Sequence, residues 1–344
     1  MSFVYKPPTE WIPPDSFPTE KLCQATEIAI DLETRDPSLK ELGPGYIRGD
    51  GEVVGISFAI DGYEDYFPFA HEQGFNFSKK KVIEFTKKIC ATDSDKIFHN
   101  SSYDVGWLTR EGVPINGRII DTMVVAPLID ENQYWYSLNA LGREYINEGK
   151  TEGELNAAAE EWGLDPKAEM WRLPSAYVGT YATQDAALTL KLWNHFKILL
   201  EEQNLWNVFD LEMRVLPVIL AMKQKGVRVD TDRAQSLKKQ LIKREKDIVQ
   251  QIKDESGVPE LQLWAANSLA KVFDAMNLTY LRTPTGMPSF TKAFLENHSH
   301  PIANLIREAR EVNKTHSTFI DSILKHAHNG RIHAEIRQLK GESG

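Results

Sequence analysis

A strand that ends in two carboxylates constrains this chain more than any other segment. Residues 28–34 read Ile-Ala-Ile-Asp-Leu-Glu-Thr, an apolar run that predicts a buried β-strand. Because side chains alternate faces along a strand, Asp31 and Glu33 project from one face while Ile30 and Leu32 pack on the other. Two like charges at this spacing repel each other, and a divalent cation removes the repulsion. Asp31 and Glu33 are therefore candidate metal ligands, and a strand running out into a polar turn is the alternative.

The composition is that of an ordinary globular protein. Of 344 residues, 42% are hydrophobic and 26% are charged, and the two cysteines, Cys23 and Cys90, lie in no Cys/His cluster. This pattern argues against a disulfide framework and against a zinc site. There is no apolar run long enough to span a bilayer and no secretory signal at the first residues, so we expect a soluble, cytoplasmic protein without a membrane partner.

The formal net charge of -9 is unevenly distributed along the chain. Residues 206–344 hold 21 Lys and Arg against 16 Asp and Glu, which leaves 19 against 33 for residues 1–205. An acidic half suits a site that gathers divalent cations, and a basic half suits a surface that lies along phosphates. An accidental asymmetry is the alternative.

The first half of the chain predicts an α/β domain. Five prolines within residues 1–24 predict an extended arm before it. Strands are expected at about residues 27–33, 53–60, 66–69, 96–99 and 118–122. The first three form an antiparallel meander, a helix at about 78–90 follows, and 123–203 read as helices. A sheet of this order, flanked by helices, fits the ribonuclease-H-like architecture over residues 25–205.

The second half, residues 206–344, predicts an elongated and mainly helical domain. Long helices are expected at residues 209–224, 231–255 and 301–326, with a Thr-Pro-Thr-Gly break at 283–286. A stripe formed by Leu237, Leu241, Ile248 and Ile252 suits an antiparallel helical hairpin, with a dimerising coiled coil as the alternative.

Two further acidic positions bear on the opening strand. Asp104 falls in the first turn of a helix that Asn100 is expected to cap, after the strand ending at His99. Tyr181 and Asp185 are four residues apart, so they share one face of a helix. Each has an ordinary explanation when taken alone, since a carboxylate in a first helical turn also interacts favourably with the helix dipole.

Taken in order, these residues resemble the three exonuclease motifs of the DEDD superfamily in its tyrosine subtype. The motifs are Asp-x-Glu at Asp31 and Glu33, Asn-x-x-x-Asp at Asn100 and Asp104, and Tyr-x-x-x-Asp at Tyr181 and Asp185. Residues 120–123 and 137–141 resemble the segments that this superfamily places between its second and third motifs. The resemblance implies a 3′→5′ exonuclease that proofreads DNA, and a ribonuclease D-like exoribonuclease is the closest rival.

The resemblance also implies the roles of these side chains. Two Mg²⁺ or Mn²⁺ ions, about 4 Å apart, would hydrolyse the phosphodiester. Asp31, Glu33 and Asp185 would hold the first ion, and Asp31 with Asp104 the second. Tyr181 would orient the attacking water, because a phenol is too weak an acid to act as the general base at neutral pH.

Other residues are expected to touch the nucleic acid. Asn100 belongs to the second motif, and Leu32 and Phe98 are candidates to wedge or stack the terminal base, with a place in the core as their alternative. We expect the substrate to be single-stranded DNA or the DNA of a primer terminus.

Segments of the second half resemble the thumb of family A DNA polymerases, which grips the duplex product. They lie at residues 210–222, 226–230, 282–289, 314–321 and 330–333. Arg282, Thr285, Ser289 and Lys314 are the residues we expect to meet phosphate oxygens, and a plain surface turn is the alternative for the loop.

In that polymerase family the palm and fingers follow this point, whereas this sequence stops at Gly344. We therefore expect no polymerase activity from this chain alone and a second polypeptide that carries the palm and fingers. The setting would be the cytoplasm of a bacterial or phage-infected cell. A free-standing nuclease, a truncated polymerase and a non-catalytic DNA-holding subunit remain alternatives.

Overall fold

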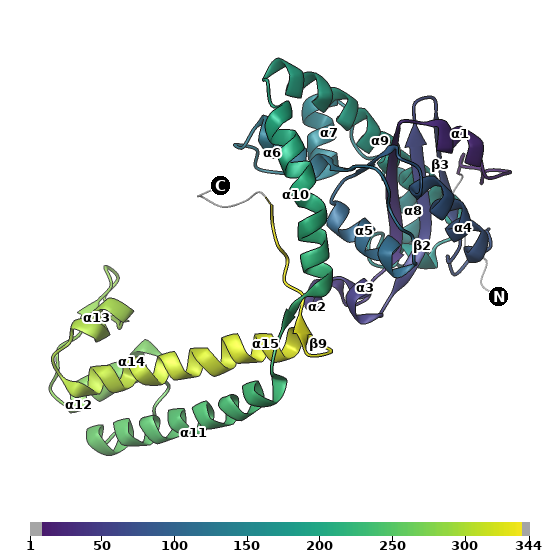
Figure 1. Ribbon diagram of the computed structural model, residues 1–344. Helices are drawn as coiled ribbons and strands as arrows, with labels where there is room; N and C mark the ends of the chain where they lie inside the picture. The colour runs from purple at the N-terminus through teal and green to yellow at the C-terminus, as the bar shows by residue number, and fades with distance from the viewer. Residues whose placement is uncertain (1–8, 339–344) are drawn as a thin grey trace. The chain divides into compact units, whose positions relative to one another are not determined.

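The computed structural model of the chain describes residues 9–338, and its contacts divide the chain into two compact units. Of the described residues, 9–226 and 334–338 belong to one unit, and Val227–His333 form the other. The first unit is α/β and the second is mainly helical (Figure 1). The helix that begins the expected second domain, α10 (Trp206–Lys225), packs as part of the first unit.

A five-stranded mixed sheet forms the centre of the first unit. Its strands are β1 (Glu27–Arg35), β2 (Glu52–Ile60), β3 (Tyr63–Pro68), β4 (Asp95–Phe98) and β5 (Ile119–Asp121), in the order β3-β2-β1-β4-β5. The pairs β1–β2 and β2–β3 are antiparallel, and the pairs β1–β4 and β4–β5 are parallel. The expected meander that continues as an α/β sheet is confirmed, and the strand with the two carboxylates is the central one.

Helices surround this sheet. They are α1 (Thr19–Gln24), α2 (Leu39–Leu42), α3 (Gly45–Arg48), α4 (Lys79–Cys90), α5 (Ser101–Arg110), α6 (Thr122–Ile129), α7 (Leu138–Ile146), α8 (Gly153–Trp162), a 3-10 turn (Met170–Arg172) and α9 (Ser175–Glu202). The long helix α9 packs across β1, β2 and β3 (Figure 1). Its inward side chains, including Leu188, Leu192 and Phe196, belong to the main hydrophobic core. This packing fixes the position of α9 against the central strand.

The extended arm expected over residues 1–24 is wrong in its last six residues. Residues 1–8 of that arm lie outside the described part, and Thr19–Gln24 form α1. Proline is tolerated where a helix begins, because the first backbone N–H groups have no partner inside the helix, and Pro18 precedes α1. Leu22 of this helix is fully buried in the core, so tertiary packing stabilises a helix that the proline-rich composition conceals.

One carboxylate organises the start of two helices. Asp121 accepts hydrogen bonds from the backbone N–H groups of Asn100 (3.0 Å) and Ser101 (2.7 Å), where α5 begins, and from that of Met123 (2.9 Å) in α6. The hydroxyl of Ser101 donates to it as well, at 2.7 Å. Asn100 was expected to cap α5 through its side chain, and this is wrong: its φ of 71° is left-handed, and its side chain makes no capping bond.

The second unit is built on long helices. They are α11 (Thr231–Ser256), α12 (Ala266–Ala275), α13 (Lys292–Asn297), α14 (Pro301–Lys314), a π-helical turn (Thr315–Ile320) and α15 (Asp321–His326). Helix α11 packs along α14, and Ile248 and Ile252 lie in the core between them, which confirms the expected pairing of helices. Leu237, at the start of the predicted stripe, is instead exposed. Among the described residues, no helix is both long and apolar enough to cross a membrane.

Short strands complete this unit where the sequence predicted none. They are β6 (Val227–Arg228), β9 (Ala327–His328) and β10 (Arg331–Ile332) in one sheet, and β7 (Leu281–Arg282) and β8 (Pro288–Ser289) in a hairpin. The loop at residues 283–286 was expected at the tip of a helical hairpin and is the tip of this β-hairpin. Gly286, with a φ of +84°, supplies the left-handed conformation that the turn requires.

We predict that Asp121→Asn lowers the free energy of unfolding by about 2–3 kcal/mol, because an amide cannot accept from every donor that faces this carboxylate and each such bond to a charged group is worth about 1.5 kcal/mol or more. Urea denaturation followed by circular dichroism measures the change. Asp61→Asn, in the exposed turn between β2 and β3, is the matched control and should leave the midpoint unchanged. Equal midpoints for both variants would contradict the capping role.

Candidate active site

Three carboxylates meet where α9 passes the central strand. Asp31 and Glu33 come from β1 and Asp185 comes from α9, and one oxygen of each lies within 4.8 Å of the other two. Glu33 and Asp185 are buried, with exposed fractions of 7% and 2%, and Asp31 is half-buried, so the cluster is open to solvent on the side of Asp31. The structure thus brings together the three side chains expected to hold the first ion.

Burial dominates the electrostatics of this cluster. Loss of solvation, followed by the charge of Asp185, raises the pKa of Asp31 to about 8. Burial likewise raises the pKa of Glu33 well above its usual range, with the charge of Asp31 adding to the effect. The pKa of Asp185 is also raised by burial, although Lys150 opposes the change. Without a cation, the cluster therefore favours bound protons over three negative charges.

Two oxygens of the cluster are suited to a divalent cation. Glu33 Oε1 and Asp185 Oδ1 are buried and have no hydrogen-bond partner among the described residues. A buried polar atom without a partner is costly, and a metal ion would satisfy it. The donors are all hard carboxylate oxygens, which suit Mg²⁺ or Mn²⁺. The side chains present therefore fit a divalent metal site.

Asp104 lies close to this cluster but outside the group of three. Its side chain, on the first turn of α5, is 4% exposed. Burial and then the charge of Asp31 raise the pKa of Asp104 well above its usual range. Among neighbouring charges Asp31 acts on it most strongly, and this is the pairing expected for the second ion.

Tyr181 is one helical turn before Asp185 on α9. Its hydroxyl accepts a hydrogen bond from the ammonium of Lys150 at 3.1 Å. Burial raises the pKa of the phenol far above its usual value, with the charge of Glu33 contributing next. The hydroxyl is therefore protonated at neutral pH and can hold a water molecule but cannot abstract its proton.

Lys150 is the member of the site that sequence reasoning missed. It follows α7, and its ammonium forms an ion pair with Asp185, 35 residues further along the chain. Burial alone would lower its pKa, but Asp185 and Asp31 outweigh burial and raise it. The sequence carries no clear signal for this contact, because a single lysine in a polar loop has no periodicity or spacing that relates it to the motifs.

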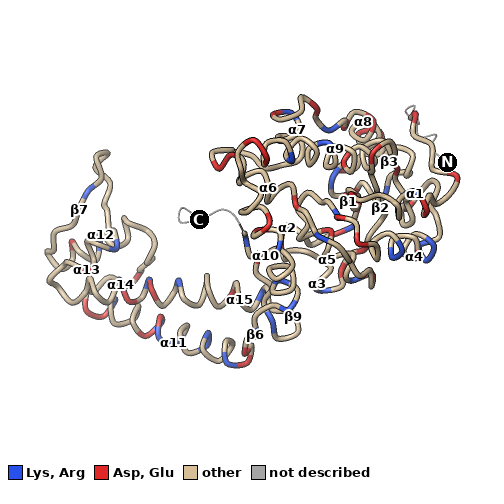
Figure 2. The backbone as a smooth tube through the Cα atoms, turned by 45° about the horizontal axis from the view of Figure 1, so that its top comes forward, with Lys and Arg blue, Asp and Glu red and all other residues tan. Residues whose placement is uncertain are grey.

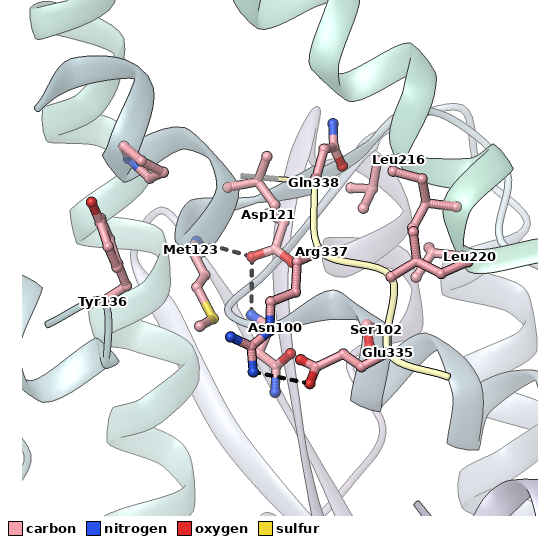
Figure 3. Close-up of a pocket in the computed structure, with 14 residues that line it drawn as sticks. Asn100, Ser102, Asp121, Met123, Tyr136, Leu216, Leu220, Glu335, Arg337 and Gln338 are labelled. Atoms are coloured by element: carbon pink, nitrogen blue, oxygen red, sulfur yellow. Dashed lines mark hydrogen bonds and ion pairs between the residues drawn. The ribbon is translucent and has the colours of Figure 1, made fainter. Parts of the chain in front are cut away.

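Of the residues expected to touch the nucleic acid in the first unit, Leu32 and Phe98 lie in the core and Asn100 lies at a surface pocket. Leu32 is 6% exposed and Phe98 is fully buried, and both belong to the hydrophobic core. Neither can stack on a base without rearrangement, so the structure favours their alternative role as core residues. Asn100 lines a surface pocket beside the start of α5, together with Met123 and Tyr136 (Figure 3).

The same pocket is closed on one side by residues 335–338. Figure 3 shows Arg337 and Glu335 there, joined by an ion pair of 3.3 Å, near Asn100. The amide of Gln338 donates to the backbone carbonyl and the carboxylate of Glu212 in α10, both at 2.6 Å.

The expected phosphate-contacting residues of the second unit lie on two elements. Arg282 and Thr285 are exposed in the β7–β8 hairpin, Ser289 is half-buried there, and Lys314 is exposed at the end of α14. Helix α11 carries charges of both signs (Figure 2), but its residues 233–244 hold five Lys and Arg and no Asp or Glu. Contact of these residues with DNA stays a prediction.

A carboxylate cluster on the central strand of a ribonuclease-H-like sheet is typical of metal-dependent nucleases. The family described as 3'-5' exonuclease matches residues 18–201, and DNA polymerase family A matches residues 231–344. The chain therefore belongs to the 3'-5' exonuclease family, in the form that accompanies family A DNA polymerases. Membership of this family implies the use of a divalent metal ion.

Individual relatives agree with this assignment. The chain is 33% identical to a DNA-directed DNA polymerase of Pseudomonas phage M6, over 99% of this chain and 53% of the relative. It is 28% identical to the DNA polymerase DpoZ of Salmonella phage PMBT28, over 93% of this chain and 51% of the relative. The chain thus spans about half the length of these curated relatives.

A solved structure shares the fold. The polymerase domain of Pol1 from M. smegmatis, in complex with DNA primer-template and dNTP, matches with a TM-score of 0.66 and 17% identity. The match covers 91% of this chain and 49% of that one.

We predict that the metal-free protein loses stability as the pH rises from about 4 to about 8. Folding raises the pKa of Asp31 from 3.8 to about 8, so the folded protein binds this proton more tightly than the unfolded chain does. The stability that the bound proton contributes is fully present below pH 3.8 and is lost as the pH rises to about 8. The slope in this window is about 1.4 kcal/mol per pH unit for one such group.

Thermal denaturation of the wild type and of Asp31→Asn in EDTA measures this effect. The variant cannot ionise at this position, so its melting temperature should fall less than that of the wild type as the pH rises. Saturating Mn²⁺ should reduce the loss in the wild type. Parallel profiles for the two proteins would show that Asp31 does not carry a raised pKa.

Proposed function

We propose that this chain removes nucleotides from the 3′ ends of DNA and edits the product of a family A DNA polymerase. The observation that carries the proposal is the buried cluster of Asp31, Glu33 and Asp185, with Asp104 and Tyr181 beside it, inside the segment that matches the exonuclease family. Residues 25–205 are proposed as the exonuclease domain and residues 206–344 as a thumb-like, DNA-binding segment.

The proposed mechanism divides the work among these side chains. A pair of Mg²⁺ or Mn²⁺ ions supplies a water nucleophile of lowered pKa and compensates the charge on the leaving 3′ oxygen. Asp31, Glu33 and Asp185 would hold one ion, and Asp31 with Asp104 the other. These ligands stand on β1, α5 and α9 rather than on loops, which restricts their positions.

Tyr181 is proposed to orient the attacking water. Its ring is buried on α9, and burial raises the pKa of the phenol, which keeps the hydroxyl protonated. A fixed donor of this kind restricts the position of a water molecule before attack, which lowers the entropic part of the barrier.

DNA is favoured over RNA because the second half of the chain matches DNA polymerase family A. The relatives of phage M6 and PMBT28 are DNA polymerases by description, and the Pol1 structure contains a DNA primer-template. A ribonuclease D-like enzyme shares the motifs but gives no reason for the match at residues 231–344. We propose that the palm and fingers of the polymerase act together with this chain.

We predict that Asp31→Ala lowers the rate of nucleoside monophosphate release from single-stranded DNA by about 10³-fold, since a loss of about 4 kcal/mol in transition-state stabilisation has this effect. The assay uses 5′-labelled DNA with Mg²⁺ or Mn²⁺, and Asp61→Ala in an exposed turn is the control. Equal rates for wild type and Asp31→Ala would refute the proposal. An RNA of the same sequence should be degraded more slowly, and equal or faster degradation of RNA would favour an exoribonuclease.

We predict that Tyr181→Phe lowers kcat by about 10- to 100-fold and changes KM little, because the ring still fills its place while the hydroxyl that positions water is gone. Single-turnover kinetics and Mn²⁺ calorimetry measure the two effects separately. Metal affinity should be retained within about threefold, a change of less than 1 kcal/mol. An unchanged kcat would show that the hydroxyl has no part in positioning water.

A further inference from the structure

A lysine ammonium reaches the carboxylate cluster in this structure. Lys150 Nζ pairs with Asp185 and donates to the hydroxyl of Tyr181 at 3.1 Å. Its side chain is 19% exposed and that of Asp185 is 3% exposed, so the pair is largely withdrawn from water. The ammonium therefore lies against a carboxylate that the proposed function assigns to a metal ion.

The backbone around Lys150 is fastened on both sides. The N–H of Lys150 donates to Asn139 Oδ1 in α7 at 3.0 Å, and the N–H of Thr151 donates to Gln184 Oε1 in α9 at 2.5 Å. The amide of Gln184 returns a bond to the carbonyl of Gly149 at 3.2 Å. Because Gln184 directly precedes Asp185, the loop is tied to the helix that carries the carboxylate, and the flexible four-carbon stem of Lys150 is the part free to move.

An ammonium and a divalent ion compete for this carboxylate. Three neighbouring carboxylates, two of them buried, repel one another when no metal ion is present, and the ammonium of Lys150 offsets one of the three charges. A divalent ion at the same carboxylates repels an adjacent ammonium, and the low dielectric of a buried site strengthens that repulsion. Binding of the ion therefore favours departure of the Lys150 side chain, while the fastened backbone keeps the ammonium within one side-chain length of the site.

We propose that Lys150 is a tethered cation with two positions. In the metal-free protein it neutralises Asp185, and when divalent ions bind it leaves Asp185 and pairs with a phosphate of the bound DNA 3′ end. Cations that meet a phosphate are a common means of stabilising its charge during transfer. The first position concerns metal binding alone, and the second rests on the proposed exonuclease function.

Calorimetric titration of Mn²⁺ without nucleic acid tests the first position. Lys150→Met, which keeps the length of the stem, should lower the Kd for Mn²⁺ by about tenfold, because the ion then binds without displacing a competing ammonium. Lys191→Met is the matched control: Lys191 lies on α9, pairs with the exposed Glu148, and should leave the Kd unchanged. An equal or weaker affinity in Lys150→Met would overturn the proposal, because it would show that Lys150 supports the metal site instead.

Removal of a buried cation also destabilises the metal-free protein, so folding has to be checked. Lys150→Met should melt at a lower temperature than the wild type in EDTA. Addition of Mn²⁺ should raise the melting temperature of the variant by more than it raises that of the wild type. If Lys150→Met does not fold without metal, Lys150→Gln keeps a polar head and provides the same comparison. A metal-induced gain equal to that of the wild type, in whichever variant folds, would also overturn the proposal.

Binding of single-stranded DNA tests the second position. With Ca²⁺ as a non-catalytic ion, the salt slope of log K against log salt should be shallower for Lys150→Met by about 0.7, the value expected for one lost phosphate contact. In EDTA the two slopes should coincide, because Lys150 then pairs with Asp185. Equal slopes in Ca²⁺ would overturn the second position. Failure of the wild type to release nucleotides would refute the proposed function while leaving the calorimetric result standing, so the two failures are distinguishable.

Discussion

Mutual repulsion among three neighbouring carboxylates, two of them buried, is the constraint that the rest of the first unit has to accommodate. Asp31 and Glu33 stand on the central strand and Asp185 on the helix packed across it, so the charges cannot separate without disrupting the core. Burial raises the pKa values of Asp31 and Glu33, and a bound cation opposes this shift by stabilising the charged carboxylates. Metal binding and folding of this unit are therefore thermodynamically linked.

Tyr66 and His71 form a second buried polar network, which lies beside Glu33. Tyr66 is fully buried near Glu33, and its hydroxyl lies 2.8 Å from His71 Nε2. The other ring nitrogen of His71 lies 3.0 Å from the carbonyl of Leu173, which can only accept, so Nδ1 carries the hydrogen and Tyr66 donates to Nε2. Burial lowers the pKa of His71 to about 4, which keeps this ring neutral and the tyrosine proton directed away from Glu33.

Much of the fold and of the carboxylate set could be predicted from local patterns, because alternation along a strand and four-residue spacing on a helix fix which side chains share a face. Asp31 with Glu33 and Tyr181 with Asp185 are of this kind. Features that depend on tertiary contact could not be predicted. The ion pair of Lys150 joins a loop to a helix, α1 is stabilised by burial of Leu22, and the left-handed Asn100 follows from the capping carboxylate of Asp121.

The shared carboxylate of Asp121 has a mechanical consequence. Since one side chain closes the first turns of both α5 and α6, these helices cannot change their starting points independently. A one-residue insertion on either side of the contact would rotate α5 by about 100°, the angle between successive residues of a helix, and carry Asp104 away from β1. The register of α5, and with it the position of Asp104, is therefore set by a residue on the neighbouring strand β5.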